Sequence, residues 1–155
     1  MVWMILFFLM TGMGTATAQE NQEIALLEAR ATSLEQRYDR ESDNPRRQTG
    51  IAVDLAKSRF EQLRSAYDTG DSEQWTEALE DYRGAVDRLE TAVTAARNVG
   101  NSKRAEVFLR RHSRDLENLK TSVSYLDRPE VEKLCDRAAD LRERILYSIL
   151  SPEED

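Results

Sequence analysis

The clearest pattern in this chain is a stripe of apolar residues between positions 75 and 96. They recur at alternating intervals of four and three residues, and charged or polar residues occupy most positions between them. The members of the stripe are Trp75, Leu79, Tyr82, Val86, Leu89, Val93 and Ala96. This spacing places them on one narrow face of an α-helix. Because such a face is unstable in water, the pattern predicts a helix that packs against others with matching stripes.

Apolar positions at the same spacing predict four more helices, over residues 22–41, 46–69, about 102–126 and about 128–150. Their stripes are Ile24, Leu27, Ala31, Leu34 and Tyr38; Ala52, Ala56, Phe60, Leu63 and Tyr67; Ala105, Leu109, His112, Leu116, Leu119, Val123 and Leu126; and Val131, Leu134, Ala138, Leu141, Ile145 and Ile149. No alternating strand pattern competes with these assignments.

Helix-capping residues separate the predicted helices. Asn44 and Pro45 are suited to the start of the second helix, Gly70 to its end, and Asp71 or Ser72 to the start of the third. We expect Gly100 to close the third helix in a left-handed conformation, with Asn101 or Ser102 capping the fourth. Since the connections are short, sequential helices should be antiparallel. The sequence therefore predicts an all-α, antiparallel bundle of about five helices with heptad-spaced apolar seams.

The first residues resemble an export signal and not part of this bundle. Val2–Met10 is an uncharged apolar run, and Ala16-Thr17-Ala18 supplies the small residues that precede a signal-peptidase cut. No basic residue precedes the run, and the alternative of an uncleaved anchor requires a longer apolar segment. We therefore predict a signal peptide over residues 1–18 and a single helical domain over 19–155 with a loose acidic end at 151–155. The expected location is the periplasm or the exterior.

Composition limits the function further. The formal net charge is −7, which disfavours general nucleic-acid binding. Cys135 is the only cysteine, so no disulfide can form within the chain. It is either a small residue packed between helices or the site of a bridge between two chains.

His112 is the only histidine and lies on the apolar stripe of the fourth predicted helix. As a functional residue it would be a metal ligand, a haem ligand or a general base. A metal site needs several converging ligands, and no such set, phosphate-binding glycine motif or catalytic pair is visible. We therefore interpret His112 as a buried histidine satisfied by Asp115, three residues on, and we predict no catalytic residue, no metal and no cofactor.

Residues 63–67, 70–71 and 78–86 read LRSAY, GD and ALEDYRGAV. This pattern resembles the core of a tetratricopeptide repeat, which would imply a peptide-binding solenoid. Extra residues separate Gly70 from Ala78, and no second copy appears. We interpret the segment as two long helices joined at a glycine.

Charge is unevenly distributed along the third and fourth predicted helices. Residues 68–90 are rich in Asp and Glu, whereas residues 103–114 carry five basic residues against Glu106. Either the fourth helix neutralises the third inside the bundle, or it presents a basic docking face. Arg104, Arg111 and Arg114 share one side of that helix and are the candidate docking residues.

The sequence thus favours an exported interaction or scaffold domain that contacts a partner protein, or an anionic envelope surface, through a helix face. It would contact a membrane only through an uncleaved signal segment. Two alternatives remain open. One is an enzyme with a site that the sequence does not reveal, and the other is a carrier that holds a small ligand inside the bundle.

Overall fold

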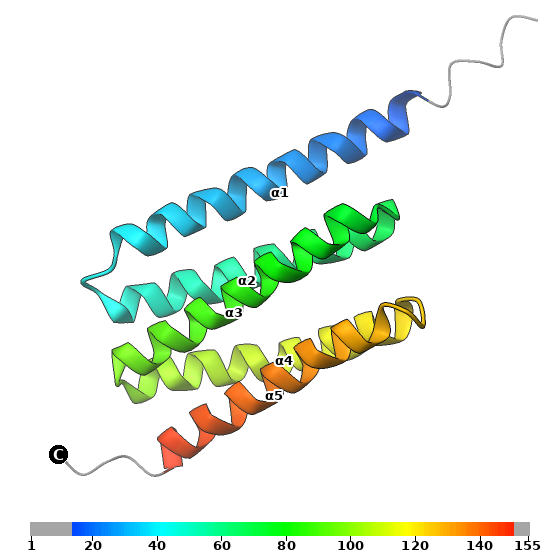
Figure 1. Cartoon of the computed structure of the whole chain (residues 1–155). Helices are drawn as coiled ribbons and strands as arrows, with labels where there is room; N and C mark the ends of the chain where they lie inside the picture. Colours follow the sequence, from blue (N-terminus) through cyan, green and yellow to red (C-terminus); the bar gives the residue numbers. More distant parts are fainter. Residues whose placement is uncertain (1–13, 151–155) are drawn as a thin grey trace, which may run out of the picture.

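The computed structural model describes residues 14–150, with side chains from residue 22 onward. This part of the chain forms five α-helices and no strand, which confirms the all-helical prediction (Figure 1). The helices are α1 (Gly14–Arg40), α2 (Pro45–Thr69), α3 (Ser72–Ala96), α4 (Val99–Ser122) and α5 (Arg128–Leu150). The first thirteen residues of the predicted signal peptide and the acidic end at 151–155 lie outside the described residues.

The helices run up and down and form two packed hairpins with one added helix. The α2–α3 pair packs against the α4–α5 pair, and α1 lies along the outer side of α2 (Figure 1). In this view α2 and α4 form the rear layer, while α3 and α5 lie in front. Helices α2, α3 and α4 each contact three other helices, and α2 is the one that also carries α1.

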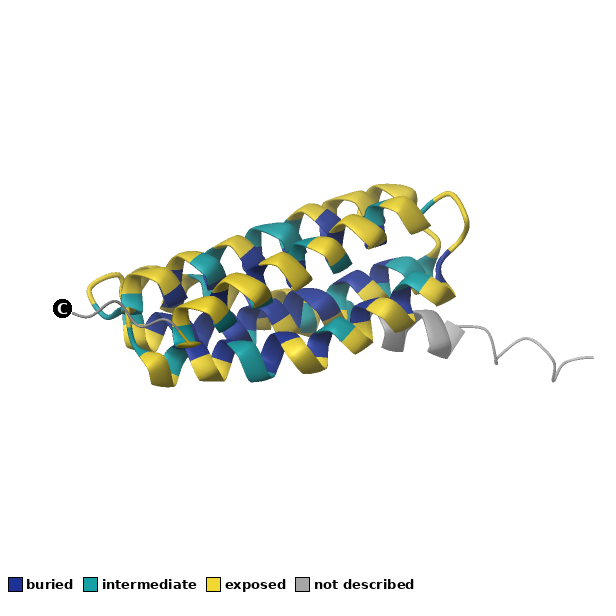
Figure 2. Ribbon diagram, turned by 90° about the horizontal axis from the view of Figure 1, so that it is seen from below, coloured by how far each residue is buried: buried dark blue, intermediate teal, exposed yellow. Residues whose placement is uncertain are grey.

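The predicted stripes form the core. Buried positions follow the faces that the helices turn toward one another, and exposed positions lie outside (Figure 2). Six members of the 75–96 stripe are buried, and Leu89 has no exposed surface. Leu126 was predicted to continue the α4 stripe, but 86% of its surface is exposed. The reason is that α4 ends at Ser122, so Leu126 falls in the turn before α5.

Most predicted helix ends are confirmed. The Asn44 side chain accepts a hydrogen bond from the Arg47 backbone N–H, Asp71 caps α3, and Gly70 ends α2 with φ +71°.

The expected role of Gly100 is wrong. Arg97 ends α3 in the left-handed region with φ 40°, and Asn98 caps α4. Gly100 lies in the first turn of α4 and donates its backbone N–H to Asn98 Oδ1 at 2.9 Å. A Cβ at Gly100 would lie 3.0 Å from that oxygen, so the glycine permits a close cap and does not reverse the chain.

Helix α1 begins earlier than predicted, at Gly14 and not at Gln22. The predicted cleavage point between Ala18 and Gln19 therefore lies within its span, and export remains a prediction. No helix in residues 14–150 has an apolar stretch long enough to cross a membrane.

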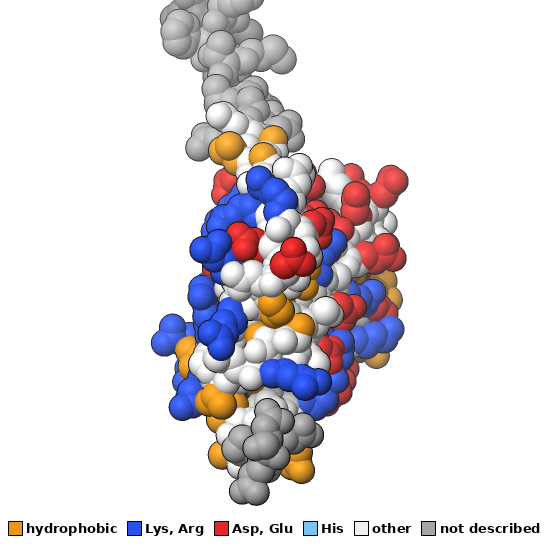
Figure 3. All heavy atoms as spheres, turned by 90° about the vertical axis from the view of Figure 1, so that its left-hand side faces the viewer, with side chains coloured by type: hydrophobic (Ala, Val, Ile, Leu, Met, Phe, Trp, Pro, Cys, Tyr) orange, Lys and Arg blue, Asp and Glu red, His pale blue; other side chains and the backbone are white. Residues whose placement is uncertain are grey.

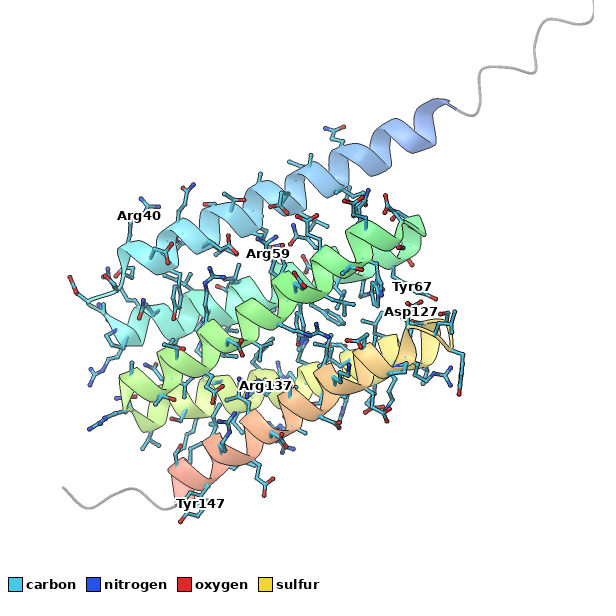
Figure 4. The ribbon with its side chains drawn as sticks, viewed as in Figure 1. Arg40, Arg59, Tyr67, Asp127, Arg137 and Tyr147 are labelled. Carbon is cyan, nitrogen blue, oxygen red and sulfur yellow. The ribbon has the colours of Figure 1, made fainter. Side chains whose placement is uncertain are left out.

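A buried arginine fixes α1 against the rest of the bundle. Only 6% of the Arg59 side chain is exposed, and its guanidinium lies between α1 and α3 (Figure 4). It contacts Glu28 Oε2 at 3.1 Å and Glu35 Oε1 at 3.0 Å, both on α1, and Asp81 Oδ2 on α3 at 2.8 Å. Since a buried charge is tolerated only when it is paired, this cluster favours the observed position of α1 against α2 and α3.

Candidate interaction surface

Three acidic residues of α3, namely Asp81, Asp87 and Glu90, are paired with helices other than α4. Asp81 pairs with Arg59 on α2. Asp87 lies 2.8 Å from Arg137 on α5, and Glu90 contacts Arg137 and Arg144 on the same helix. Arg137 is accordingly placed between α3 and α5 (Figure 4). No ion pair joins α3 to α4 within residues 22–150, so direct pairing between these two helices does not support the alternative in which α4 neutralises α3.

The basic residues of α4 are consequently left on the surface. Arg104, Arg111 and Arg114 are exposed, and none has a carboxylate within 4.0 Å in the described part of the chain. Arg110 differs because it pairs with Glu106 at 3.8 Å. Lys and Arg side chains gather along the left edge of Figure 3, which is the side of α2 and α4. The three predicted docking residues therefore form an arginine face without internal partners.

Arg104 and Arg111 border a groove of about 400 Å³ between α2 and α4. The groove is lined by Val53 and Lys57 of α2 and by Arg104, Val107, Phe108, Arg111, His112 and Asp115 of α4. The buried members, Val53, Phe108 and His112, form its floor, whereas the charged members other than histidine are exposed and form its rim. Arg114 is not part of the lining. The predicted face thus continues into a concave site that the sequence did not reveal.

Two residues of α2 shape the groove. Gly50 lies beneath the Arg104 guanidinium, and a Cβ at this position would be 3.0 Å from Arg104 Nη1. The missing side chain therefore gives the arginine room to lie against α2. Lys57 places its ammonium 5.9 Å from the centre of the Phe108 ring and 3.4 Å from Asp54, adding a positive charge opposite the arginines.

The floor rests on an aromatic cluster around His112. The His112 Nε2 and the Tyr82 hydroxyl lie 2.8 Å apart, and the ring centres of Phe60 and Phe108 lie 4.5 and 4.9 Å from that of His112. Asp115 was the predicted partner, but its Oδ2 is 3.7 Å from Nδ1, too long for a hydrogen bond. Tyr82 on α3 satisfies the ring instead. Tyr82 is only 1% exposed and His112 only 3%, so both members of the pair are almost completely shielded from solvent.

Cys135 lies half-buried against the core on α5. Burial raises the pKa of its thiol to about 11, so the reactive thiolate is scarce at neutral pH. This placement matches the interpretation as a residue packed between helices. A bridge between chains remains untested.

The described residues contain no group of three or more His, Cys, Asp or Glu side chains arranged to hold a metal ion. Comparisons with protein-family models, curated proteins and solved structures give no match. The two helices that resemble a tetratricopeptide repeat have 25 residues each. Together they exceed the roughly 34 residues of one such repeat, so they do not form a unit of that size.

Proposed function

We propose that this protein is an exported helical interaction domain, periplasmic or secreted, that binds an acidic partner protein through the arginine face of α4. The observations that carry the proposal are that Arg104, Arg111 and Arg114 share one side of α4, that none has a carboxylate within 4.0 Å among the described residues, and that two of them border the groove. The formal net charge of −7 makes such a concentration of unpaired positive charge more distinctive.

Arginine suits this role. Its planar guanidinium binds a carboxylate through two parallel hydrogen bonds, and it is less strongly hydrated than an ammonium group. Surface ion pairs contribute only about 0–1 kcal/mol to stability, so exposed arginines gain little for the fold. A set on one side of a helix, next to a groove, instead favours association by steering an acidic partner toward the site.

The two alternative functions, a carrier of a small ligand and an enzyme, have weaker support. The groove is open and has a charged rim, whereas a carrier of small apolar ligands needs an enclosed apolar cavity. A general base at His112 would need access to substrate, but the ring is only 3% exposed and its Nε2 is engaged by Tyr82.

The test is affinity capture from an extract of the envelope and secreted fraction of the source organism. The variant changes Arg104, Arg111 and Arg114 to Glu. A matched control changes Lys103, Arg110 and Arg128 to Glu, which reverses the same number of exposed charges outside the groove. We expect the wild type and the control to capture the same acidic protein, and the variant to lose it. Equal capture by all three proteins would contradict the proposal.

The captured protein is then purified and its affinity measured at low and high salt. Because exposed charges are screened within about 10 Å at 0.1 M salt, binding through the arginines should weaken strongly as salt rises. Salt-independent binding would show that the arginine face does not dominate the contact.

A further inference from the structure

We infer that the α2–α4 groove binds an amphipathic α-helix of the partner, with acidic residues seven positions apart and aliphatic residues between them. This inference rests on the proposed function, because it takes the arginine face as the docking site and specifies what docks there.

The spacing of the groove residues carries the inference. Arg104 and Arg111 lie seven positions apart, which is about 10.5 Å along a helix at 1.5 Å per residue. Val107 and Phe108 follow Arg104 by three and four positions and therefore lie between the two arginines on the same side. One wall of the groove thus presents a basic, an apolar and a second basic group of side chains in order along its length.

A partner helix lying along this wall has the same rise per residue. Acidic residues at positions i and i+7 then fall opposite Arg104 and Arg111, while an aliphatic residue at i+3 or i+4 falls over Val107 and Phe108. The match holds for either direction of the partner helix, because the pattern is nearly symmetric. Lys57 on the opposite wall adds a third positive charge within reach of the partner.

Asp115 limits where such a helix can lie. It lines the groove four positions after Arg111 and is exposed. A third acidic residue of the partner opposite Asp115 would be repelled, since like charges brought together oppose binding. The preferred partner is therefore acidic over two positions and neutral or basic at the next turn.

The shape of the site favours a helix over a membrane. A flat layer of anionic headgroups would touch only the rim charges and leave the buried floor of Val53 and Phe108 without contact. A narrow helix can use the rim and the floor together.

The experiment measures binding of the purified protein to a fluorescent peptide of about 20 residues, a length that supports helix formation. The peptide carries two Glu seven positions apart, Leu three and four positions after the first, and neutral helix-forming residues elsewhere. A second peptide has the same composition with the two Glu four positions apart. We expect the first peptide to bind at least about tenfold more tightly, which corresponds to 1.4 kcal/mol.

The variant R104E/R111E should weaken binding of the first peptide by at least about tenfold. The matched control K103E/R110E changes the residues immediately before these arginines, rotated about 100° around the helix, and should leave the affinity within about threefold. V107S should weaken binding severalfold, because Val107 is only partly buried and contributes apolar surface to the groove. Circular dichroism checks that each variant stays helical.

Three results would overturn the inference, and they separate it from the proposed function. If polyglutamate and the second peptide bind as tightly as the first, and R104E/R111E abolishes all three, the arginines dock acidic chains but no particular helix. If the variant loses binding only to vesicles containing phosphatidylglycerol, the partner is a lipid surface. If no acidic probe distinguishes the wild type from the variant, both the inference and the proposed function are wrong.

Discussion

The Tyr82 hydroxyl and the His112 Nε2 lie 2.8 Å apart across the α3–α4 interface, and both side chains are almost completely buried. Burial lowers the pKa of His112 to about 4, and the nearby Asp115 carboxylate only partly opposes this shift. Burial also raises the pKa of Tyr82. The pair is therefore a neutral hydrogen bond at neutral pH. Either ring nitrogen can carry the proton in this neutral pair, and Nε2 is the one that contacts the Tyr82 hydroxyl.

This pairing predicts a loss of stability in mild acid. Below the unfolded pKa of about 6.5 the unfolded chain protonates His112, whereas the folded chain does so only near pH 4. The stability is thus complete above pH 6.5 and is lost as the pH falls toward 4. Between pH 7 and pH 5 the free energy of unfolding should fall by about 2 kcal/mol through this group.

Urea unfolding at both pH values measures the effect. The control variant His112→Gln keeps a hydrogen-bonding group opposite Tyr82 and removes the titration. Asp115 and Lys57, the charged groups near the ring, remain in the control. If His112→Gln loses as much stability as the wild type between pH 7 and pH 5, the pH dependence comes from the carboxylates and not from His112.

The Arg59 cluster predicts that this guanidinium strengthens the seat of α1 on α2, beside the buried residues Ala31, Leu34 and Tyr38. Arg59→Met keeps an apolar stem but removes the charge that joins Glu28 and Glu35 to α2. We expect amide hydrogen exchange to increase mainly in α1, with α5 unchanged, because α1 packs chiefly on α2. The free energy of unfolding should fall by about 1–3 kcal/mol, less than for a fully buried pair, since the carboxylates are partly hydrated. Uniform exchange across all helices would show that the cluster supports the bundle as a whole.

The sequence predicted the helices well because each carries a continuous apolar stripe, and the residues of such a stripe are the ones that become buried. It also contained an overlooked signal for Arg59, which occupies a stripe position three residues after Ala56 and four before Leu63. Its partners were not predictable, since they depend on how α1 is rotated and shifted against α2. The same limit applies to the groove. Intervals within α4 placed Arg104 and Arg111 on one side, but nothing in the sequence showed that Lys57 faces them.

Leu89 tests the central stripe. Its side chain has no exposed surface, so Leu89→Ala should lower the free energy of unfolding by roughly 2–5 kcal/mol through lost apolar burial and a residual cavity. Chemical denaturation followed by circular dichroism provides the measurement. A change below about 1 kcal/mol would mean that the surrounding helices collapse around the smaller side chain or that this face is not in the core.

Export predicts a specific intact mass. Cleavage between Ala18 and Gln19 would remove residues 14–18 from the start of α1. The buried residues Ala31, Leu34 and Tyr38 would remain. The cleaved protein should therefore remain folded. Mass spectrometry of the protein recovered from the periplasm or medium tests the predicted cleavage. A mass that still includes residues 1–18 would contradict it.

Charge reversal should separate the arginines that stabilise the bundle from those left for a partner. Arg137 on α5 contacts Asp87 and Glu90 on α3, so Arg137→Glu would place a third carboxylate beside two others. Because the Arg137 side chain is 39% exposed, solvent reduces the penalty, and we expect a loss of about 1–2 kcal/mol.

Reversing Arg104, Arg111 and Arg114 together should instead leave the melting temperature nearly unchanged, although it alters three charges and not one. These side chains are exposed and have no carboxylate partner in residues 22–150, and surface substitutions of this kind usually change stability by less than about 0.5 kcal/mol each. The new carboxylate at position 111 would repel Asp115 four residues on, which costs only a few tenths of a kcal/mol on an exposed helix surface. Thermal unfolding of both variants in the same buffer makes the comparison. If the triple variant melts well below Arg137→Glu, the arginine face stabilises the bundle, and its lack of partners cannot be taken as a sign of docking.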